Sequence, residues 1–257
     1  MPELNYKSFG SGPPLIILHG LFGTLDNWQT IAKKLADDFT VFILDLRNHG
    51  KSPHTQEHTY SLMAEDLSQF MESQWIYKAH VLGHSMGGKT AMQFANDFPD
   101  MLDKLVVVDI APKVYAGGHQ HILEALLSVD IDAVQSRKEV EQQLSKYIEE
   151  DGVKLFLMKN LSRKKEGGFR WKMNLQTLNR SYLNILSALQ FEEPIESPSL
   201  FIYGGNSSYI NSEDKVNIQD NFVNARFLKV ENAGHWVHAE QPQILTDAVR
   251  DFLMETE

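Results

Sequence analysis

The sequence predicts an α/β protein whose core is a doubly wound, mostly parallel sheet and whose chain is interrupted by a helical cap. Its apolar runs are short, β-rich and without alternation, which is typical of strands in a parallel sheet covered on both faces. Segments with a helical period lie between these runs, and strands that alternate with helices form right-handed, doubly wound sheets. One long block contains helical patterns and predicts the cap.

The expected elements alternate along the chain. Short runs rich in β-branched and other apolar residues predict strands at 15–18, 41–45, 79–82, 104–110, 199–203 and 226–230. Apolar residues with a helical period predict helices at 26–38, 61–74, 87–98 and 242–255. The first three helices each separate two successive strands, as crossovers in a parallel sheet do.

The block at 113–192 breaks this alternation. It shows helical patterns such as those at 122–129 and 137–150, and no convincing strand. We therefore expect a core domain at 1–112 and 193–257, with a helical cap inserted at 113–192 after the strand that contains Asp109. The cap would lie above the carboxyl edge of the sheet, where open α/β sheets bind ligands.

Composition and charge restrict the partners and the location. The formal net charge of −10 argues against nucleic acid, because phosphate-dominated binding needs a basic face. The chain has no cysteine, and no apolar run approaches the roughly 20 residues of a membrane span. Its start, MPELNYKSFG, lacks the basic and apolar regions of a signal peptide. We expect a cytoplasmic protein with a small-molecule partner, and its oligomeric state is left open.

The segment Gly83-His84-Ser85-Met86-Gly87 is a G-x-S-x-G pattern between an expected strand and an expected helix. In this context a sharp turn strains the serine backbone and raises its hydroxyl above the sheet, and the glycines leave room for chain and substrate. Ser85 is therefore the predicted nucleophile, with helix capping as the structural alternative. His84 is expected to pack or to hydrogen-bond without entering the chemistry.

The loop after the strand at 15–18 is the expected source of one oxyanion donor. Such a loop supplies a backbone N–H, and the residue after the nucleophile, here Met86, supplies the other. Within the loop, Leu21 is the predicted donor and Phe22 the alternative. A tight turn explains His19 and Gly20 without any catalytic role.

These segments resemble the α/β-hydrolase superfamily in order and spacing, over nearly the whole chain outside the cap. The motifs that carry the resemblance are HGLFG (19–23), DLRNHGKSPH (45–54), GHSMGG (83–88) and GHW (234–236). More narrowly, DLRNHGKSPH and the cap segment GGFRWKMNL (167–175) are similar to the YbfF-type esterases and their mitochondrial relatives, the α/β-hydrolase domain-containing 11 proteins. The resemblance implies the α/β-hydrolase fold and a serine hydrolase.

The base that activates Ser85 is expected after the last strand. A serine hydroxyl is a weak nucleophile until an imidazole takes its proton. His235 follows the strand at 226–230 and completes the chain order Ser, acid, His of this fold. His238 falls at the start of the next helix and is expected to be structural.

The acid that orients the histidine is not where most superfamily members carry it, because Ser207 occupies that position after the strand at 199–203. YbfF-type enzymes place their acid at the end of the strand that follows the nucleophile strand, which here is Asp109. Neighbouring strands lie about 4.8 Å apart, so this position also reaches the histidine loop. A carboxylate in an apolar run is costly unless paired, although a turn at the strand end is the structural alternative for Asp109. Glu213 and Asp214 are the fallback acids.

Two other polar motifs are interpreted as structural. Asp45 and Arg47 are expected to pair and to shape the loop beside the oxyanion hole. The segment HTQEH (54–58) lacks the HExxH order of zinc sites, and no Gly-rich phosphate fingerprint follows a strand. We therefore expect neither a metal nor a cofactor.

An apolar pocket for an acyl group is predicted if the cap closes over the sheet. Its candidate walls, which plain core packing also explains, are Leu21, Phe22, Met86, Trp171 and Trp236. The segment at 162–172 is rich in cations, which either form a solvated loop or contact a coenzyme A phosphate: Arg163, Lys164, Lys165, Arg170 and Lys172. Of these, Arg170 is expected to face inward and bind substrate.

The sequence thus predicts a cofactor-free serine hydrolase that cleaves carboxylic esters or acyl thioesters through an acyl-enzyme on Ser85. Asp109 and His235 complete the predicted triad. Amide or carbon–carbon hydrolysis by the same triad is the alternative among enzymes. A slow-turnover ligand sensor of the same fold is the alternative from another class.

Overall fold

The computed structural model describes residues 3–118 and 120–255, so positions 1, 2, 119, 256 and 257 of the predicted domain ranges lie outside the described residues. The core is one mostly parallel sheet of seven strands in the order β1-β3-β2-β4-β5-β8-β9. Within this sheet, as far as the structure describes it, only the edge pairing of β1 with β3 is antiparallel. The strands are β1 (Tyr6–Phe9), β2 (Pro14–Leu18), β3 (Thr40–Leu44), β4 (Ala79–His84), β5 (Leu102–Val108), β8 (Ser199–Gly204) and β9 (Ala225–Val230).

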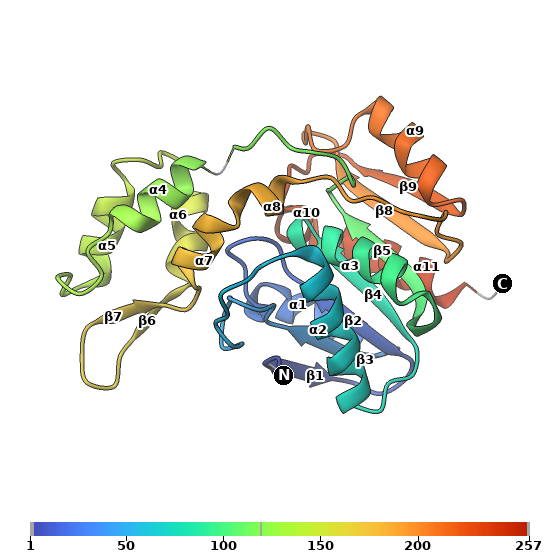
Figure 1. Cartoon of the computed structure of the whole chain (residues 1–257), viewed down its shortest axis with the longest axis horizontal. Coiled ribbons are helices and arrows are strands. Elements are labelled where there is room, and N and C mark those ends of the chain that lie inside the picture. The colour runs from blue at the N-terminus through green and yellow to red at the C-terminus, as the bar shows by residue number, and fades with distance from the viewer. Residues whose placement is uncertain (1–2, 119, 256–257) are drawn as a thin grey trace.

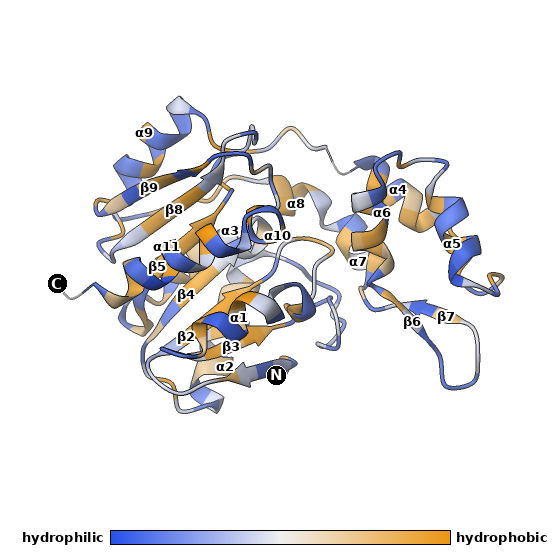
Figure 2. Ribbon diagram, turned by 180° about the vertical axis from the view of Figure 1, so that it is seen from behind, coloured by the Kyte–Doolittle hydropathy of each residue, from blue (hydrophilic) through white to orange (hydrophobic). Residues whose placement is uncertain are grey.

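Helices cover both faces of the sheet, and each face has its own apolar core. One face packs against α2 (Tyr60–Ser73), α3 (Met86–Asp97) and α9 (Ser212–Asn221). The other packs against η1 (Leu25–Trp28), α1 (Gln29–Leu35), α10 (Val237–Glu240) and α11 (Pro242–Met254). Figure 1 shows α2 and α3 in front of the sheet, and Figure 2, seen from behind, shows α1 and α11 in front. The predicted doubly wound α/β architecture is confirmed.

Burial explains why the central strands read as unbroken apolar runs. Every residue of β4 is buried, as are nearly all residues of β2 and β5, because helices cover both faces. A short turn, η2 (Pro99–Met101), leads into β5. Strand β1 was not predicted, because at the sheet edge its sequence YKSF is partly exposed and carries no apolar run.

The chain between β5 and β8 forms a separate layer beyond the carboxyl ends of the parallel strands, at the left of Figure 1. It contains α4 (Gln120–Ser128), α5 (Arg137–Leu144), α6 (Asp151–Met158), β6 (Leu161–Arg163), β7 (Phe169–Trp171), α7 (Leu175–Arg180) and α8 (Tyr182–Leu186). The expectation that this block has no strand is wrong, because β6 and β7 form an antiparallel hairpin. Gly167 and Gly168, both with positive φ, form part of the turn that makes the hairpin possible.

Lys89 of α3 fixes both crossings between the sheet and the inserted layer. Its side chain is buried, and Nζ donates to the carbonyl oxygens of Lys113 (2.8 Å) and Ser187 (2.5 Å). These two residues lie where the chain leaves and re-enters the core. Burial, and secondarily the charge of Lys113, lowers the pKa of Lys89 to about 7.

In the described part of the chain, the helices are too short or too polar to cross a membrane. The cytoplasmic location stays a prediction.

Candidate active site

Ser85 lies in the sharp turn between β4 and α3, with φ 53° and ψ −120°. A left-handed backbone at a non-glycine residue is strained, and here the turn is held by hydrogen bonds from Ser85 N to Val108 O and from Lys89 N to Ser85 O, both 3.0 Å. The flanking glycines are needed for space. A Cβ on Gly83 would lie 2.1 Å from the carbonyl oxygen of Gly87, and one on Gly87 would lie 2.5 Å from that of Leu18. The G-x-S-x-G spacing is therefore a steric requirement of this turn.

Asp109 directly follows β5 and contacts His235, which lies 126 positions further along the chain. Asp109 Oδ2 is 2.7 Å from His235 Nδ1, and the carboxylate is fully buried. The Asp109 backbone is left-handed, with φ 52°, and its N–H donates to Ile202 O on β8 at 2.8 Å. The predicted acid and the predicted base are thus brought into hydrogen-bond contact, and their catalytic roles stay a prediction.

Ser207, at the position where the superfamily pattern leads one to expect the acid, contributes to the same carboxylate. Its hydroxyl donates to Asp109 Oδ2 at 2.5 Å, while the N–H of Gly204 donates to Oδ1 at 3.0 Å. With His235, Asp109 therefore has three hydrogen-bond donors, as a buried carboxylate requires. In the sequence, Ser207 is visible only as a departure from the family pattern, and no local signal indicates this contact.

The aromatic rings of Tyr209 and His84 both pack beside the His235 ring. The ring of Tyr209 stacks on the imidazole, with centroids 3.8 Å apart and planes at 19°. Burial, and then the charges of His238 and His235, lowers the pKa of His84 well below its usual value. Neutral His84 donates from Nε2 to the carbonyl oxygen of His235 at 2.9 Å, which ties the nucleophile turn to the histidine loop. The stacking of Tyr209 had no signal in the sequence.

His238 has a different environment. It lies in α10 and stacks on Trp28, with centroids 4.6 Å apart. Burial lowers the pKa of His238 to about 3, so it is a neutral packing group. This environment agrees with its expected structural role.

The loop after β2 forms a tight turn from Gly20 to Gly23, closed by a hydrogen bond from Gly23 N to Gly20 O at 2.9 Å. His19 braces the turn: its Nε2 accepts from Leu46 N at 3.0 Å, and its Nδ1 donates to Gly20 O at 2.8 Å. Leu21 from this turn and Met86, the first residue of α3, both line the space next to Ser85. The N–H groups of a helix start have no helical partner, which makes the Met86 amide an available donor.

Two pockets meet at Ser85 and Leu21. The first extends under α4 and α6, and its apolar walls include Phe22, Ile122, Val153, Phe156, Leu157 and Trp236. The second extends between α2 and α8, and its walls include Tyr60, Ile110, Tyr115, Tyr182, Ile185 and Tyr209. Of the predicted substrate contacts, Phe22 and Trp236 lie beside Ser85.

The other two predicted substrate contacts, Arg170 and Trp171, do not line the pockets beside Ser85. They line a separate, more polar pocket between the hairpin and the start of η1, together with Lys51 and Lys172. Arg170 is exposed and Trp171 is half-buried. The expectation that Arg170 faces inward is wrong, because neighbouring residues of a strand point to opposite faces and the buried Phe169 occupies the inner one.

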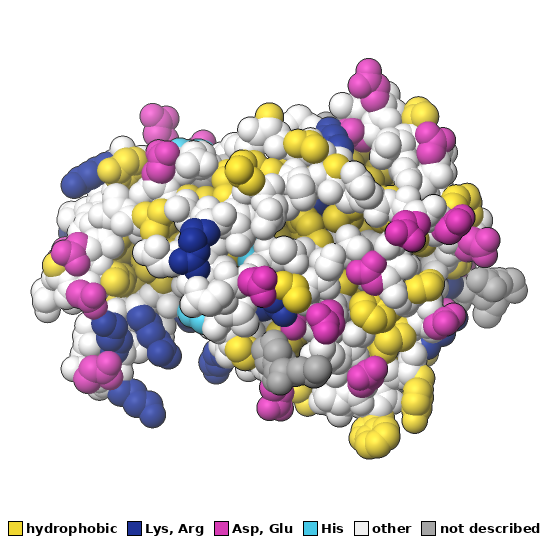
Figure 3. Space-filling model, in the orientation of Figure 1, with side chains coloured by type: hydrophobic (Ala, Val, Ile, Leu, Met, Phe, Trp, Pro, Cys, Tyr) yellow, Lys and Arg dark blue, Asp and Glu magenta, His cyan; other side chains and the backbone are white. Residues whose placement is uncertain are grey.

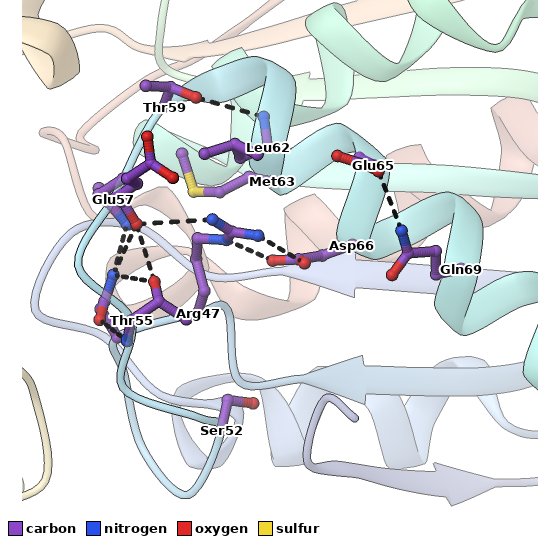
Figure 4. Close-up of polar contacts among 12 residues, drawn as sticks. Arg47, Ser52, Thr55, Glu57, Thr59, Leu62, Met63, Glu65, Asp66 and Gln69 are labelled. Carbon is purple, nitrogen blue, oxygen red and sulfur yellow. Dashed lines mark hydrogen bonds and ion pairs between the residues drawn. The ribbon is translucent and has the colours of Figure 1, made fainter. Parts of the chain in front are cut away.

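The expected pair of Asp45 and Arg47 is also wrong. The Arg47 guanidinium binds Asp66 of α2, with Nε 2.5 Å from Oδ2 and Nη2 2.7 Å from Oδ1, as Figure 4 shows. Asp45 instead accepts hydrogen bonds from Asn5, from Leu25 N and from Lys51 N. The spacing of residues in the sequence therefore does not indicate the hydrogen-bond partners of Asp45 or Asp66.

The fallback acids lie at the start of α9. Asp214 forms a capping box with Asn211 and an ion pair with Lys113 at 2.6 Å, and Glu213 is exposed. Both are accounted for as groups that stabilise the helix start. Over the described ranges, no group of three or more His, Asp and Glu side chains is arranged to hold a metal ion.

A model of the alpha/beta hydrolase fold family matches residues 13–242. The chain belongs to this family. It is 39% identical to the sn-1-specific diacylglycerol lipase ABHD11 of Mus musculus over 94% of this chain and 81% of the relative. It is 36% identical to the Esterase YbfF of Escherichia coli, covering 93% of this chain and 92% of the relative. These two matches confirm the resemblance that the motifs predicted.

A solved structure agrees over nearly the whole chain. A marine microorganism esterase is 43% identical and superposes with a TM-score of 0.96, covering 98% of this chain and 100% of that one. The predicted α/β-hydrolase fold is confirmed.

Proposed function

We propose that this protein is a carboxylic-ester hydrolase that works through an acyl-enzyme on Ser85, with His235 as base and Asp109 as acid. The observation that supports it best is the contact of 2.7 Å between Asp109 and His235 in a pocket that also contains the strained Ser85 turn. The relatives reported above are esterases and a lipase, in agreement with this class.

The chemistry follows from the positions of these groups. His235 takes the proton of the Ser85 hydroxyl as the oxygen attacks the ester carbonyl, and Asp109 stabilises the imidazolium that forms. The backbone N–H groups of Leu21 and Met86 stabilise the negative charge on the tetrahedral intermediate. His235 then protonates the leaving alcohol, and a water molecule releases the acid from Ser85 in the reverse sequence.

The substrate has two apolar parts. Ser85 lies where the two pockets meet, so an ester bond at its hydroxyl would direct the acyl part into one pocket and the alcohol part into the other. The walls of both pockets are mainly aliphatic and aromatic, which favours hydrocarbon over charged groups. Esters with an apolar acyl chain and an uncharged alcohol fit this arrangement.

Acyl thioesters are the second substrate class. The polar pocket beside the hairpin is lined by more cationic than anionic side chains. The cations are Lys7, Lys51, Arg170 and Lys172, and the carboxylates are Asp26 and Asp45. Figure 3 shows Lys and Arg side chains gathered at the hairpin, at lower left, on a surface that is otherwise rich in acidic groups. A leaving group with phosphates, such as coenzyme A, has the charge that this pocket attracts.

The test is multiple-turnover hydrolysis of a p-nitrophenyl ester chain-length series beside acyl-CoA thioesters, with wild type and Ser85→Ala. We expect sustained ester turnover that Ser85→Ala abolishes. A preference for acyl-CoA that Arg170→Ala and Lys172→Ala reduce, without affecting p-nitrophenyl esters, would make thioesters the principal class. Absence of any turnover with either series would contradict the proposal.

A further inference from the structure

Asn160 lies in the inserted layer, between α6 and β6. It contacts the loop after β2 at 19–23, here called the oxyanion loop because it contains the predicted donor Leu21. Its side chain is almost fully buried, and Nδ2 donates to the carbonyl oxygen of Phe22 at 2.7 Å. Its backbone is held from two directions, because its N–H donates to Leu157 O at 2.9 Å and its carbonyl accepts from Lys172 N at 2.8 Å. The amide is thus presented to Phe22 by the junction of a helix and a hairpin.

Phe22 is the residue of the oxyanion turn that needs such support. It is third in the turn from Gly20 to Gly23 and has a positive φ of 60°. A turn with positive φ at its third position ordinarily has glycine there, and a side chain at left-handed backbone costs about 1–2 kcal/mol. The alternative turn, with negative φ, flips the peptide between Leu21 and Phe22 and so changes the direction of the loop N–H groups.

We propose that Asn160 is a positioning residue that keeps this turn in its left-handed form and thereby aims the loop N–H groups at the oxyanion. The inference rests on the proposed function and adds to it a residue from the inserted layer. Asn160 does not touch the reacting atoms. It acts through the carbonyl group of Phe22. This carbonyl belongs to the peptide between Phe22 and Gly23, which directly follows the peptides that carry the Leu21 and Phe22 N–H groups.

The same contact couples the pocket to the loop. Val153, Phe156 and Leu157 of α6 form one wall of the first pocket, and Leu21 and Phe22 form another. Asn160 follows α6 directly and holds its C-terminal end against the loop. An acyl chain that fills this pocket therefore contacts both elements whose spacing Asn160 fixes.

Stability of the inserted layer does not by itself account for this side chain. The Oδ1 atom of Asn160 is buried and has no hydrogen-bond partner in the described protein. A buried polar atom in that state costs about 1–3 kcal/mol, which an apolar side chain of similar size would avoid. The Nδ2 contact with Phe22 is the interaction that the amide group specifically supplies.

The experiment compares Asn160→Leu, which keeps the volume and removes the donor, with Val140→Ala. Val140 is fully buried in α5 and lines neither pocket, so its truncation loosens the inserted layer without touching the loop. We expect kcat of Asn160→Leu to fall about ten- to hundredfold, less than for complete loss of an oxyanion donor, with KM close to wild type. Val140→Ala should keep kcat near wild type.

Inhibitor binding separates positioning from general loosening. A trifluoromethyl ketone forms a tetrahedral oxyanion on the serine, whereas the matching alcohol does not. Asn160→Leu should weaken the ketone in proportion to kcat and leave the affinity for the alcohol unchanged. Equal weakening of both compounds, or the same loss of kcat in Val140→Ala, would overturn the proposal.

Hydrogen exchange gives a readout that does not depend on activity. The Gly23 amide closes the turn, so its protection should fall in Asn160→Leu and persist in Val140→Ala. If Asn160→Leu does not fold, Asn160→Ala, which also lacks the donor, gives the same comparison. Absence of turnover in wild type would refute the proposed function, whereas unchanged Gly23 protection in a folded Asn160 variant would refute this inference alone.

Discussion

Replacing Ser207 with alanine removes one of three donors from the Asp109 carboxylate. In the wild type, Oδ2 accepts from Ser207 and His235 at 2.5 and 2.7 Å, and Oδ1 accepts from Gly204 N at 3.0 Å. Because Asp109 is fully buried, water cannot readily replace the lost hydroxyl. The variant therefore perturbs the acid while all three predicted triad residues stay in place.

The magnitude follows from the type of bond. A hydrogen bond to a charged group contributes about 1.5–3 kcal/mol, so the free energy of unfolding should fall by about that amount. The effect on catalysis is smaller than that of removing the acid, because two donors still orient the carboxylate. We expect kcat to fall about tenfold, which corresponds to about 1.4 kcal/mol in the barrier.

Two assays measure these effects. Urea titration gives the free energy of unfolding, and hydrolysis of one p-nitrophenyl ester gives kcat, each for wild type and Ser207→Ala. Ser208→Ala is the matched control, because Ser208 is exposed and adjacent. If Ser207→Ala kept the stability and the kcat of wild type and of Ser208→Ala, the hydroxyl would have no part in holding the acid.

Three further predictions concern the scaffold and the pocket. Arg47→Met should lower the free energy of unfolding by about 3–5 kcal/mol in urea titrations, because it leaves the buried Asp66 unpaired. Adding Asp66→Leu to this variant should restore most of the lost stability. If the double variant were no more stable than Arg47→Met, this explanation would be wrong. The pKa of Lys89 is lowered to about 7, so above that pH the unfolded chain binds a proton that the folded chain has released, and stability rises with pH up to about 10.4. Urea titrations at pH 7 and pH 9.5 should show this rise in wild type beyond any in Lys89→Met, whereas equal changes would refute it. Phe156→Ala enlarges the first pocket and should shift the kcat/KM optimum of an ester series to longer acyl chains, by about 0.8 kcal/mol per accommodated methylene; an unchanged optimum would place the acyl chain elsewhere.

Local patterns were enough to predict the sheet and the Ser85 turn. The strand pattern reflects burial on both faces, and the spacing of Gly83 and Gly87 reflects direct steric contact within one turn. The approach of Asp109 to His235 could also be anticipated, because β5 and β8 are adjacent strands whose ends meet at one edge. An acid at the end of either strand can reach the same histidine loop, which is why Ser207 and Asp109 meet there.

The contacts that could not be predicted join residues far apart in the chain. Ser207 and Asp109 are separated by 98 positions, and Asn160 and Phe22 by 138. No period or motif connects such residues, since each pair depends on how the inserted layer and the loops pack. The prediction that Arg47 pairs with its neighbour Asp45 is wrong for the same reason, because an arginine side chain is long enough to reach Asp66 on α2.

The most direct test of the central claim is the turnover of Asp109→Asn beside Glu213→Gln and Asp214→Asn on one p-nitrophenyl ester. Loss of the charge that orients His235 should lower kcat by roughly 10⁴-fold in Asp109→Asn and leave substrate affinity nearly unchanged. The other two variants should keep kcat within a few-fold of wild type. Retained turnover in Asp109→Asn, with a large loss in either variant of the α9 carboxylates, would show that the acid lies elsewhere.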